Sequence, residues 1–115
     1  HSFELGYQGV KRLMKLPDPP TAVILSNYDT TLGGIMAINE SGLNCPGDIS
    51  IIGFDDILMT KVIRPKLWIM VQPMEEMSKR AIEMLLNRIT KKEEGVPIRI
   101  SFSARMREGN SIRKM

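Results

Sequence analysis

Two short apolar runs, separated by a segment of helical periodicity, constrain the fold more than any other feature of the sequence. The first is residues 21–26 (T-A-V-I-L-S) and the second is residues 49–54 (I-S-I-I-G-F). Between them, apolar residues recur at helical spacing over residues 29–41. Because both runs are almost wholly apolar, each predicts a strand that is covered on both faces, as in a parallel sheet. The order strand, crossover helix, strand therefore predicts a parallel βαβ unit and an α/β fold.

The helix between the two runs carries signals for its start and its end. Asp29 or Thr30 can cap its first turn, because both side chains can accept hydrogen bonds from free backbone N–H groups. Gly42 stands where a residue in the left-handed conformation commonly follows a helix. For Asp29 alone, we favour capping over contact with a ligand.

The other periodic segments predict two further helices and two further strands. They are a helix over residues 3–14, a strand over 67–72, a long helix over 73–92 and a half-exposed, alternating strand over 98–106. Residues 55–65 show no regular pattern.

The composition excludes several protein classes. Hydrophobic residues make up 43% of the chain and charged residues 25%, as in an ordinary globular domain, and no apolar run approaches the roughly 20 residues that span a bilayer. No signal peptide pattern opens the sequence, and the lack of an initial Met suggests a fragment. The single cysteine, Cys45, favours a reducing cytoplasm. Basic side chains predominate in residues 61–115 with few aromatic residues among them, which favours a solvated surface over a nucleic-acid interface.

Polar side chains follow each apolar run at the point where the predicted strand ends. Asn27 follows the first, and Asp55 and Asp56 follow the second. The carboxyl ends of parallel strands share one edge of a sheet, so we expect these ends on one rim, one or two strands apart. An amide beside a carboxylate suits a neutral polyhydroxyl ligand. The alternative is that these residues only shape loops, and for Asp56 we favour a turn over a ligand contact.

No pattern in the sequence predicts catalysis. His1 is the only histidine, and no nucleophile elbow, phosphate-binding glycine loop or metal-ligand spacing is visible. Two carboxylates adjacent in sequence point in different directions and do not form an acid–base pair. We therefore expect neither enzymatic activity nor a metal or cofactor.

Three segments together resemble the LacI/GalR family of bacterial transcription regulators. They are P-P-T-A-V-I-L-S-N-Y-D-T-T-L-G-G, G-L-N-C-P-G-D-I-S-I-I-G-F-D-D and V-Q-P-M-E-E-M, and the resemblance extends from Gly6 to Glu108. It implies the C-terminal part of an effector-binding core with a type I periplasmic-binding-protein-like fold. It also implies a cytoplasmic repressor, a small-molecule effector such as a sugar or nucleobase-like metabolite, a homodimer, and contact with operator DNA through an N-terminal helix-turn-helix absent from this sequence.

The resemblance also assigns residues to the ligand site. Asn27 and Asp55 match positions that commonly contact the effector in this family, and Gln72 matches a glutamine beside the cleft. His1 falls where many members have an aromatic residue that stacks on the ligand. Tyr28 replaces the usual aspartate, so that a phenol takes the place of one polar contact.

Two further departures from the family pattern lie in the strand over residues 67–72. Trp68 and Ile69 stand where two threonines are usual. Trp68 could stack on a ligand, but we favour packing.

The resemblance divides the chain into residues 1–72 of the effector-binding subdomain, residues 73–97 as a crossover helix of the N-terminal subdomain, and residues 98–115 as a return strand and tail. The helix would then have an apolar stripe without a sheet of its own to cover. The stripe consists of Met74, Met77, Ala81, Leu85 and Ile89. We expect it to pack against a neighbouring chain or to fold back onto this one.

A periplasmic sugar-binding protein of a transporter is the alternative function, because such proteins share this architecture. An upstream helix-turn-helix would favour the regulator, and an upstream signal peptide would favour the transporter.

Overall fold

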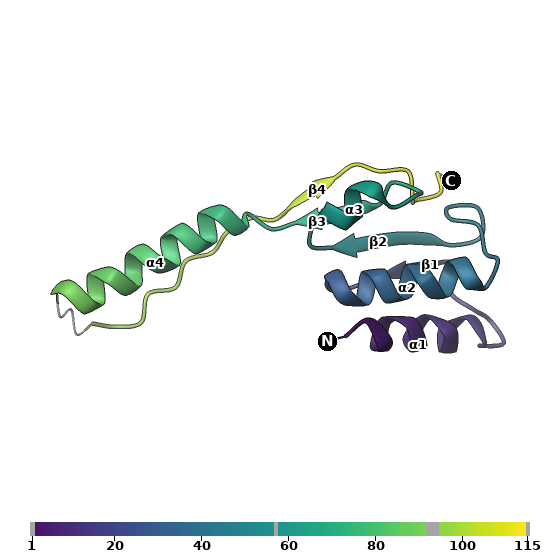
Figure 1. Ribbon diagram of the computed structural model, residues 1–115, viewed down its shortest axis with the longest axis horizontal. Coiled ribbons are helices and arrows are strands. Elements are labelled where there is room, and N and C mark those ends of the chain that lie inside the picture. Colours follow the sequence, from purple (N-terminus) through teal and green to yellow (C-terminus); the bar gives the residue numbers. More distant parts are fainter. Residues whose placement is uncertain (1, 57, 92–94, 115) are drawn as a thin grey trace. The chain divides into compact units, whose positions relative to one another are not determined.

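The computed structural model describes residues 2–56, 58–91 and 95–114. In chain order the elements are α1 (Phe3–Met14), β1 (Ala22–Ile24), α2 (Tyr28–Glu40), β2 (Ser50–Phe54), α3 (Leu58–Val62), β3 (Trp68–Val71), α4 (Met74–Lys91) and β4 (Arg105–Arg107) (Figure 1). The chain divides into two compact units. The first comprises residues 1–71 and 106–115, and the second comprises residues 72–105.

A four-stranded sheet in the order β1-β2-β3-β4 forms the centre of the first unit. β2 pairs in parallel with β1 and with β3. The predicted parallel βαβ unit, with α2 as its crossover helix, is therefore confirmed, and so is the α/β class.

The core of the first unit lies between the sheet and the helices that cover it. Its members come from α1, from α2, and from the strands and the residues next to them, and all are almost fully buried. They are Val10, Val23, Leu25, Ile35, Ala37, Ile38, Ile49, Ile51 and Leu67. Burial of each large aliphatic side chain contributes roughly 1.5–3 kcal/mol to stability.

α1 and α2 pack closely because glycines lie at their contact. A Cβ atom on Gly6 would lie 2.2 Å from the carbonyl oxygen of Thr30, and one on Gly33 would lie 2.0 Å from that of Phe3. Both distances are far shorter than a van der Waals contact, so neither position has room for a side chain. This contact fixes the first turn of α2 against α1.

Two sequence predictions of local structure were wrong. Residues 55–65 contain the short helix α3, whose Thr60 is fully buried. The strand expected over residues 98–106 is limited to Arg105–Arg107. An alternating pattern does not supply a hydrogen-bonding neighbour, and β3, the strand beside β4, has only four residues.

The second unit consists of α4 and the segment over residues 95–104, which runs along the helix in Figure 1. The segment lies on the charged face, where Ile100 and Phe102 line a shallow pocket together with Glu76, Lys79, Arg80 and Glu83. It therefore leaves the apolar stripe uncovered: Leu85 is 59% exposed and Ile89 is 64% exposed. The prediction that the stripe is covered by folding back was wrong, and packing against another chain stays a prediction.

None of the helices in the described part of the chain is long and apolar enough to cross a membrane.

The glycine contact between α1 and α2 makes a prediction about stability. Gly33→Ala is expected to lower the free energy of unfolding by about 1–3 kcal/mol or more, because the new methyl group overlaps the backbone of α1. Gly9→Ala is the matched control, since a Cβ there meets nothing within 4 Å, and better helix propensity is expected to stabilise it by up to about 1 kcal/mol. Urea unfolding of both variants measures the difference. Equal stabilities would contradict the close contact.

Candidate functional site

Polar residues follow the first two strands at the same edge of the sheet and at equivalent positions in the strand register. In the β1–β2 register, Ile24 is opposite Ile52, and the N–H of Leu25 donates to the carbonyl oxygen of Ile52 at 2.9 Å. Asn27 and Asp55 each lie three residues beyond this aligned pair. Because the strands are parallel neighbours, the expectation that their polar ends share one rim is confirmed.

Asn27 caps the start of α2. Its Oδ1 accepts a hydrogen bond from the backbone N–H of Thr30 at 2.9 Å, and the Thr30 hydroxyl accepts one from the N–H of Asn27 at 3.2 Å. The two residues thus form a reciprocal capping box. The prediction that Asp29 caps the helix was wrong, because the helix begins one residue earlier than its spacing suggested, whereas Thr30 does take part. Gly42 has the predicted left-handed conformation, with φ of 71°.

Asp55 has an uncommon backbone conformation directly after β2. Its φ is 70°, and among the described residues it is the non-glycine residue with a positive φ. The left-handed region costs an ordinary residue roughly 1–2 kcal/mol, although Asp and Asn adopt it more readily than most. The N–H of Asp55 donates to the carbonyl oxygen of Met70 at 3.0 Å. The turn is therefore tied to β3 at the residue where the strained conformation occurs.

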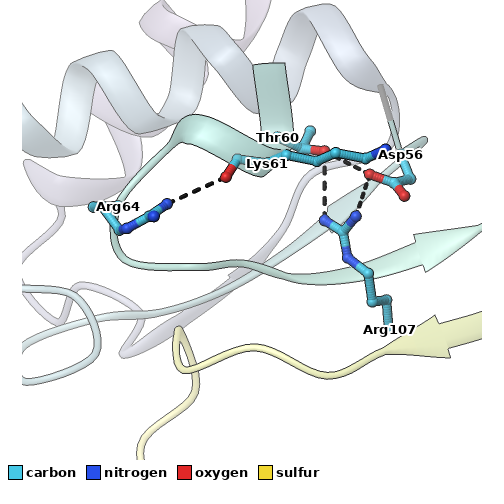
Figure 2. A network of polar contacts seen from close by, with 5 residues as sticks. All are labelled: Asp56, Thr60, Lys61, Arg64 and Arg107. Atoms are coloured by element: carbon cyan, nitrogen blue, oxygen red, sulfur yellow. Dashed lines mark hydrogen bonds and ion pairs between the residues drawn. The ribbon is translucent and has the colours of Figure 1, made fainter. Parts of the chain in front are cut away.

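Asp56 is held by two partners from different parts of the chain. Its Oδ1 accepts a hydrogen bond from the hydroxyl of Thr60 at 2.7 Å and forms an ion pair with Arg107 (Figure 2). A terminal nitrogen of Arg107 also lies 3.5 Å from the Thr60 hydroxyl oxygen. The side chains of Asp56 and Arg107 are only 16% and 24% exposed. We call these three residues the Asp56 cluster.

No pattern in the sequence indicates the Asp56 cluster. For Asp56, a turn was favoured over a ligand contact, and neither alternative included an ion pair. The partner, Arg107, lies 51 residues further along the chain, so no local spacing could indicate the contact. Thr60 lies in residues 55–65, where the sequence shows no regular pattern that would predict a helix.

The remaining candidate ligand residues are Tyr28, Gln72 and His1. Tyr28 is the first residue of α2 and is half-buried. Gln72 is half-buried and begins the second unit. His1 lies outside the described residues.

Trp68 and Ile69, the two departures from the family pattern, both lie in β3 and differ in burial. Ile69 is fully buried, so it belongs to the interior. Trp68 is half-buried, and its backbone N–H donates to the hydroxyl of Ser111 at 2.8 Å. That hydroxyl donates in turn to the carbonyl oxygen of Ile51 at 2.6 Å, so Ser111 connects β3 with β2.

No described group of three or more His, Cys, Asp or Glu side chains could hold a metal ion. Burial raises the pKa of the Cys45 thiol, although a hydrogen bond with the backbone of Ile51 acts in the opposite direction. A raised pKa reduces the fraction of reactive thiolate, and Cys45 is therefore poorly suited to act as a nucleophile.

Comparison with known proteins identifies relatives of this chain. Residues 2–112 match the periplasmic binding protein-like domain. The chain is 43% identical over 93 residues to the "Probable HTH-type transcriptional repressor ExuR" of Bacillus subtilis, covering 81% of this chain and 28% of the relative. It is 41% identical, with the same coverage, to the repressor PurR of Haemophilus influenzae. The chain thus spans about a quarter of the length of these curated relatives.

A solved structure supports the same relationship. The fold matches that of a LacI family transcriptional regulator from Enterococcus faecium with bound ribose, with a TM-score of 0.79 and 30% identity over 96% of this chain and 40% of that one. The sequence motifs, the parallel sheet and these relatives agree. The chain belongs to the periplasmic binding protein-like domain family, and within it to the LacI/GalR type.

Proposed function

We propose that the chain is the ligand-contacting part of a transcriptional repressor's effector core, and that a small polyhydroxyl molecule binds at the edge of the sheet that carries Asn27 and Asp55. The observation that carries this proposal is the register of β1 and β2, in which these two residues follow the aligned pair Ile24 and Ile52 by the same number of residues. The ribose bound in the Enterococcus faecium regulator supports a sugar as the ligand class. A nucleobase-like metabolite, which the family resemblance also implies, belongs in the test panel as well.

The chemistry of the two residues suits such a ligand. The carboxylate of Asp55 can accept hydrogen bonds from two hydroxyl groups, and charged hydrogen bonds of this kind contribute roughly 1.5–3 kcal/mol each. The amide of Asn27, whose Oδ1 caps the helix, carries both an acceptor and a donor, which suits the hydroxyl groups of such a ligand. Tyr28, Gln72 and His1 are proposed as additional contacts from the family resemblance.

The whole protein would couple this binding to DNA. In the proposed repressor, the effector changes the affinity for operator DNA of a helix-turn-helix domain outside this chain, and the protein acts as a cytoplasmic homodimer without enzymatic activity. The curated relatives are transcriptional repressors. A periplasmic transport protein therefore fits less well.

The exposed stripe on α4 fits the same arrangement. We propose that residues 73–97 belong to a second subdomain, whose sheet covers the stripe in the intact regulator. In support, the return segment lies on the charged face of α4 rather than on its apolar face. Apolar surface of this extent is costly to leave in water.

Removal of one charge tests the ligand site. In the intact regulator, Asp55→Asn is expected to weaken sugar binding by about 1.5–3 kcal/mol, because it removes a charged acceptor while keeping a residue that tolerates the left-handed conformation. Titration calorimetry with the sugars and nucleobases selected by a thermal-shift screen measures the loss. Asp18→Asn, in an exposed loop, is the control and should bind normally. Unchanged affinity in Asp55→Asn would remove this residue from the site.

A pair of substitutions separates the two roles of Asn27. Asn27→Ala is expected to lower stability by about 0.5–2 kcal/mol through loss of the cap, and also to weaken effector binding. Asn27→Ser keeps a capping oxygen but lacks the amide, so its stability should stay near that of the wild type while binding falls. Thermal unfolding and calorimetry on both variants measure the two effects. Normal binding by Asn27→Ser would leave capping as the function of this residue.

Shortening one side chain of the stripe tests whether α4 is covered in the intact protein. In the intact protein, Leu85→Ala is expected to cost about 2–5 kcal/mol of unfolding free energy, as for a buried leucine. Lys79→Ala, on the charged face of the same helix, should change stability by less than about 0.5 kcal/mol. Denaturant unfolding measures both. A loss in Leu85→Ala as small as that of the control would show that the stripe stays exposed.

A further inference from the structure

We infer that Asp56 and Arg107 act as positioning residues that hold Asp55 in its left-handed conformation at the carboxyl edge of the sheet. This inference rests on the proposed function, because it concerns how the proposed ligand contact is presented. Its basis is the Asp56 cluster, which lies directly beside Asp55 in the chain and joins Asp56 and Thr60, four residues apart, to the distant Arg107 (Figure 2).

The backbone conformation of Asp55 needs support from its surroundings. A residue with a φ of 70° persists in a sparsely populated region only when neighbouring contacts determine it. One such contact is the hydrogen bond from the N–H of Asp55 to the carbonyl oxygen of Met70, which fixes the peptide group before the residue. The side chain of Asp56 is anchored on the other side. The strained residue is thus held between two fixed points.

The Asp56 cluster is suited to act as the second fixed point. The Thr60 hydroxyl donates to Asp56 and accepts from Arg107, while Arg107 also pairs with Asp56. Each side chain therefore contacts both of the others. Thr60 is fully buried, and the ion pair is largely removed from water. Loss of one partner would leave the other charge without compensation in a poorly solvated place, which is more costly than losing an exposed ion pair.

The position of Arg107 in the chain connects the Asp56 cluster to β4. Arg107 ends β4, two residues after the second unit ends at Arg105. The ion pair therefore ties the turn at Asp55 to the place where the chain re-enters the first unit. Nε of Arg107 is also buried without a hydrogen-bond partner among the described residues, so this side chain is held chiefly by its two terminal nitrogens.

The test uses the intact regulator and two readouts. The variants are Asp56→Asn, Arg107→Leu, Arg107→Lys and the double variant Asp56→Asn/Arg107→Leu, with Arg105→Leu as the control because it is an exposed arginine of the same strand. Hydrogen exchange at the amide of Asp55 reports the turn without any ligand. Ribose affinity by calorimetry reports the site.

We expect Asp56→Asn and Arg107→Leu each to accelerate exchange at Asp55 and to weaken ribose binding by about tenfold, and Arg105→Leu to change neither. The double variant should be no worse than the more affected single variant, because the two residues act through one contact. Arg107→Lys should recover part of the ribose affinity, since it retains the charge. A purely global loss of stability would accelerate exchange throughout the first unit and would give no selective effect at Asp55.

The outcomes separate this inference from the proposed function. If Asp55→Asn weakens ribose binding but Asp56→Asn and Arg107→Leu leave both exchange and affinity unchanged, the positioning role is overturned and the site stands. If neither the wild type nor any variant binds ribose, the ribose reading of the site fails, and exchange at Asp55 still decides the positioning role. If Arg107→Leu does not fold, the near-isosteric Asp56→Asn decides by the same two readouts.

Discussion

The parallel pairing of β2 with both β1 and β3 is the constraint on which the rest of the structure depends. It makes three strands end at one edge, and it sets Asn27 level with Asp55 because each follows the aligned pair Ile24 and Ile52 by the same number of residues. A slip of one residue in the register would turn the buried side chains of β2 outward. The packing of the core and the position of the polar edge are therefore determined by the same hydrogen bonds.

The packing of α1 against α2 helps to position the side chain of Asn27. Gly6 of α1 contacts the backbone of Thr30, and Thr30 is the residue that exchanges hydrogen bonds with Asn27 in the capping box. A steric requirement between two helices thus helps to hold the amide at the edge of the sheet. Asn27 caps the helix through Oδ1, and the same side chain is the proposed contact with the effector. Capping and ligand binding are compatible for this residue type because an amide carries both an acceptor and donors.

The sequence allowed prediction of the features that depend on short-range pattern. The two apolar runs, the crossover helix, its terminal Gly42 and the long helix α4 all follow from periodicity and from capping chemistry. What it missed depends on contacts between distant segments. Asp29 and Asn27 are both good capping residues, and only the position of the first helical turn decides between them. The ion pair between Asp56 and Arg107 has no signature at a separation of 51 residues. Alternation near β4 could not reveal how short its neighbouring strand is.

The adjacent carboxylates after β2 have different surroundings for a physical reason. Two negative charges on consecutive residues at one ligand edge would repel each other, and each would also have to be solvated there. The ion pair with Arg107 compensates the charge of Asp56 in a poorly exposed position, so Asp56 adds little negative charge to the edge. The left-handed turn at Asp55 allows this separation, because it changes the direction of the chain between the two side chains. The strain in the turn and the ion pair beside it are then two parts of one arrangement, in which the second aspartate determines where the first can act.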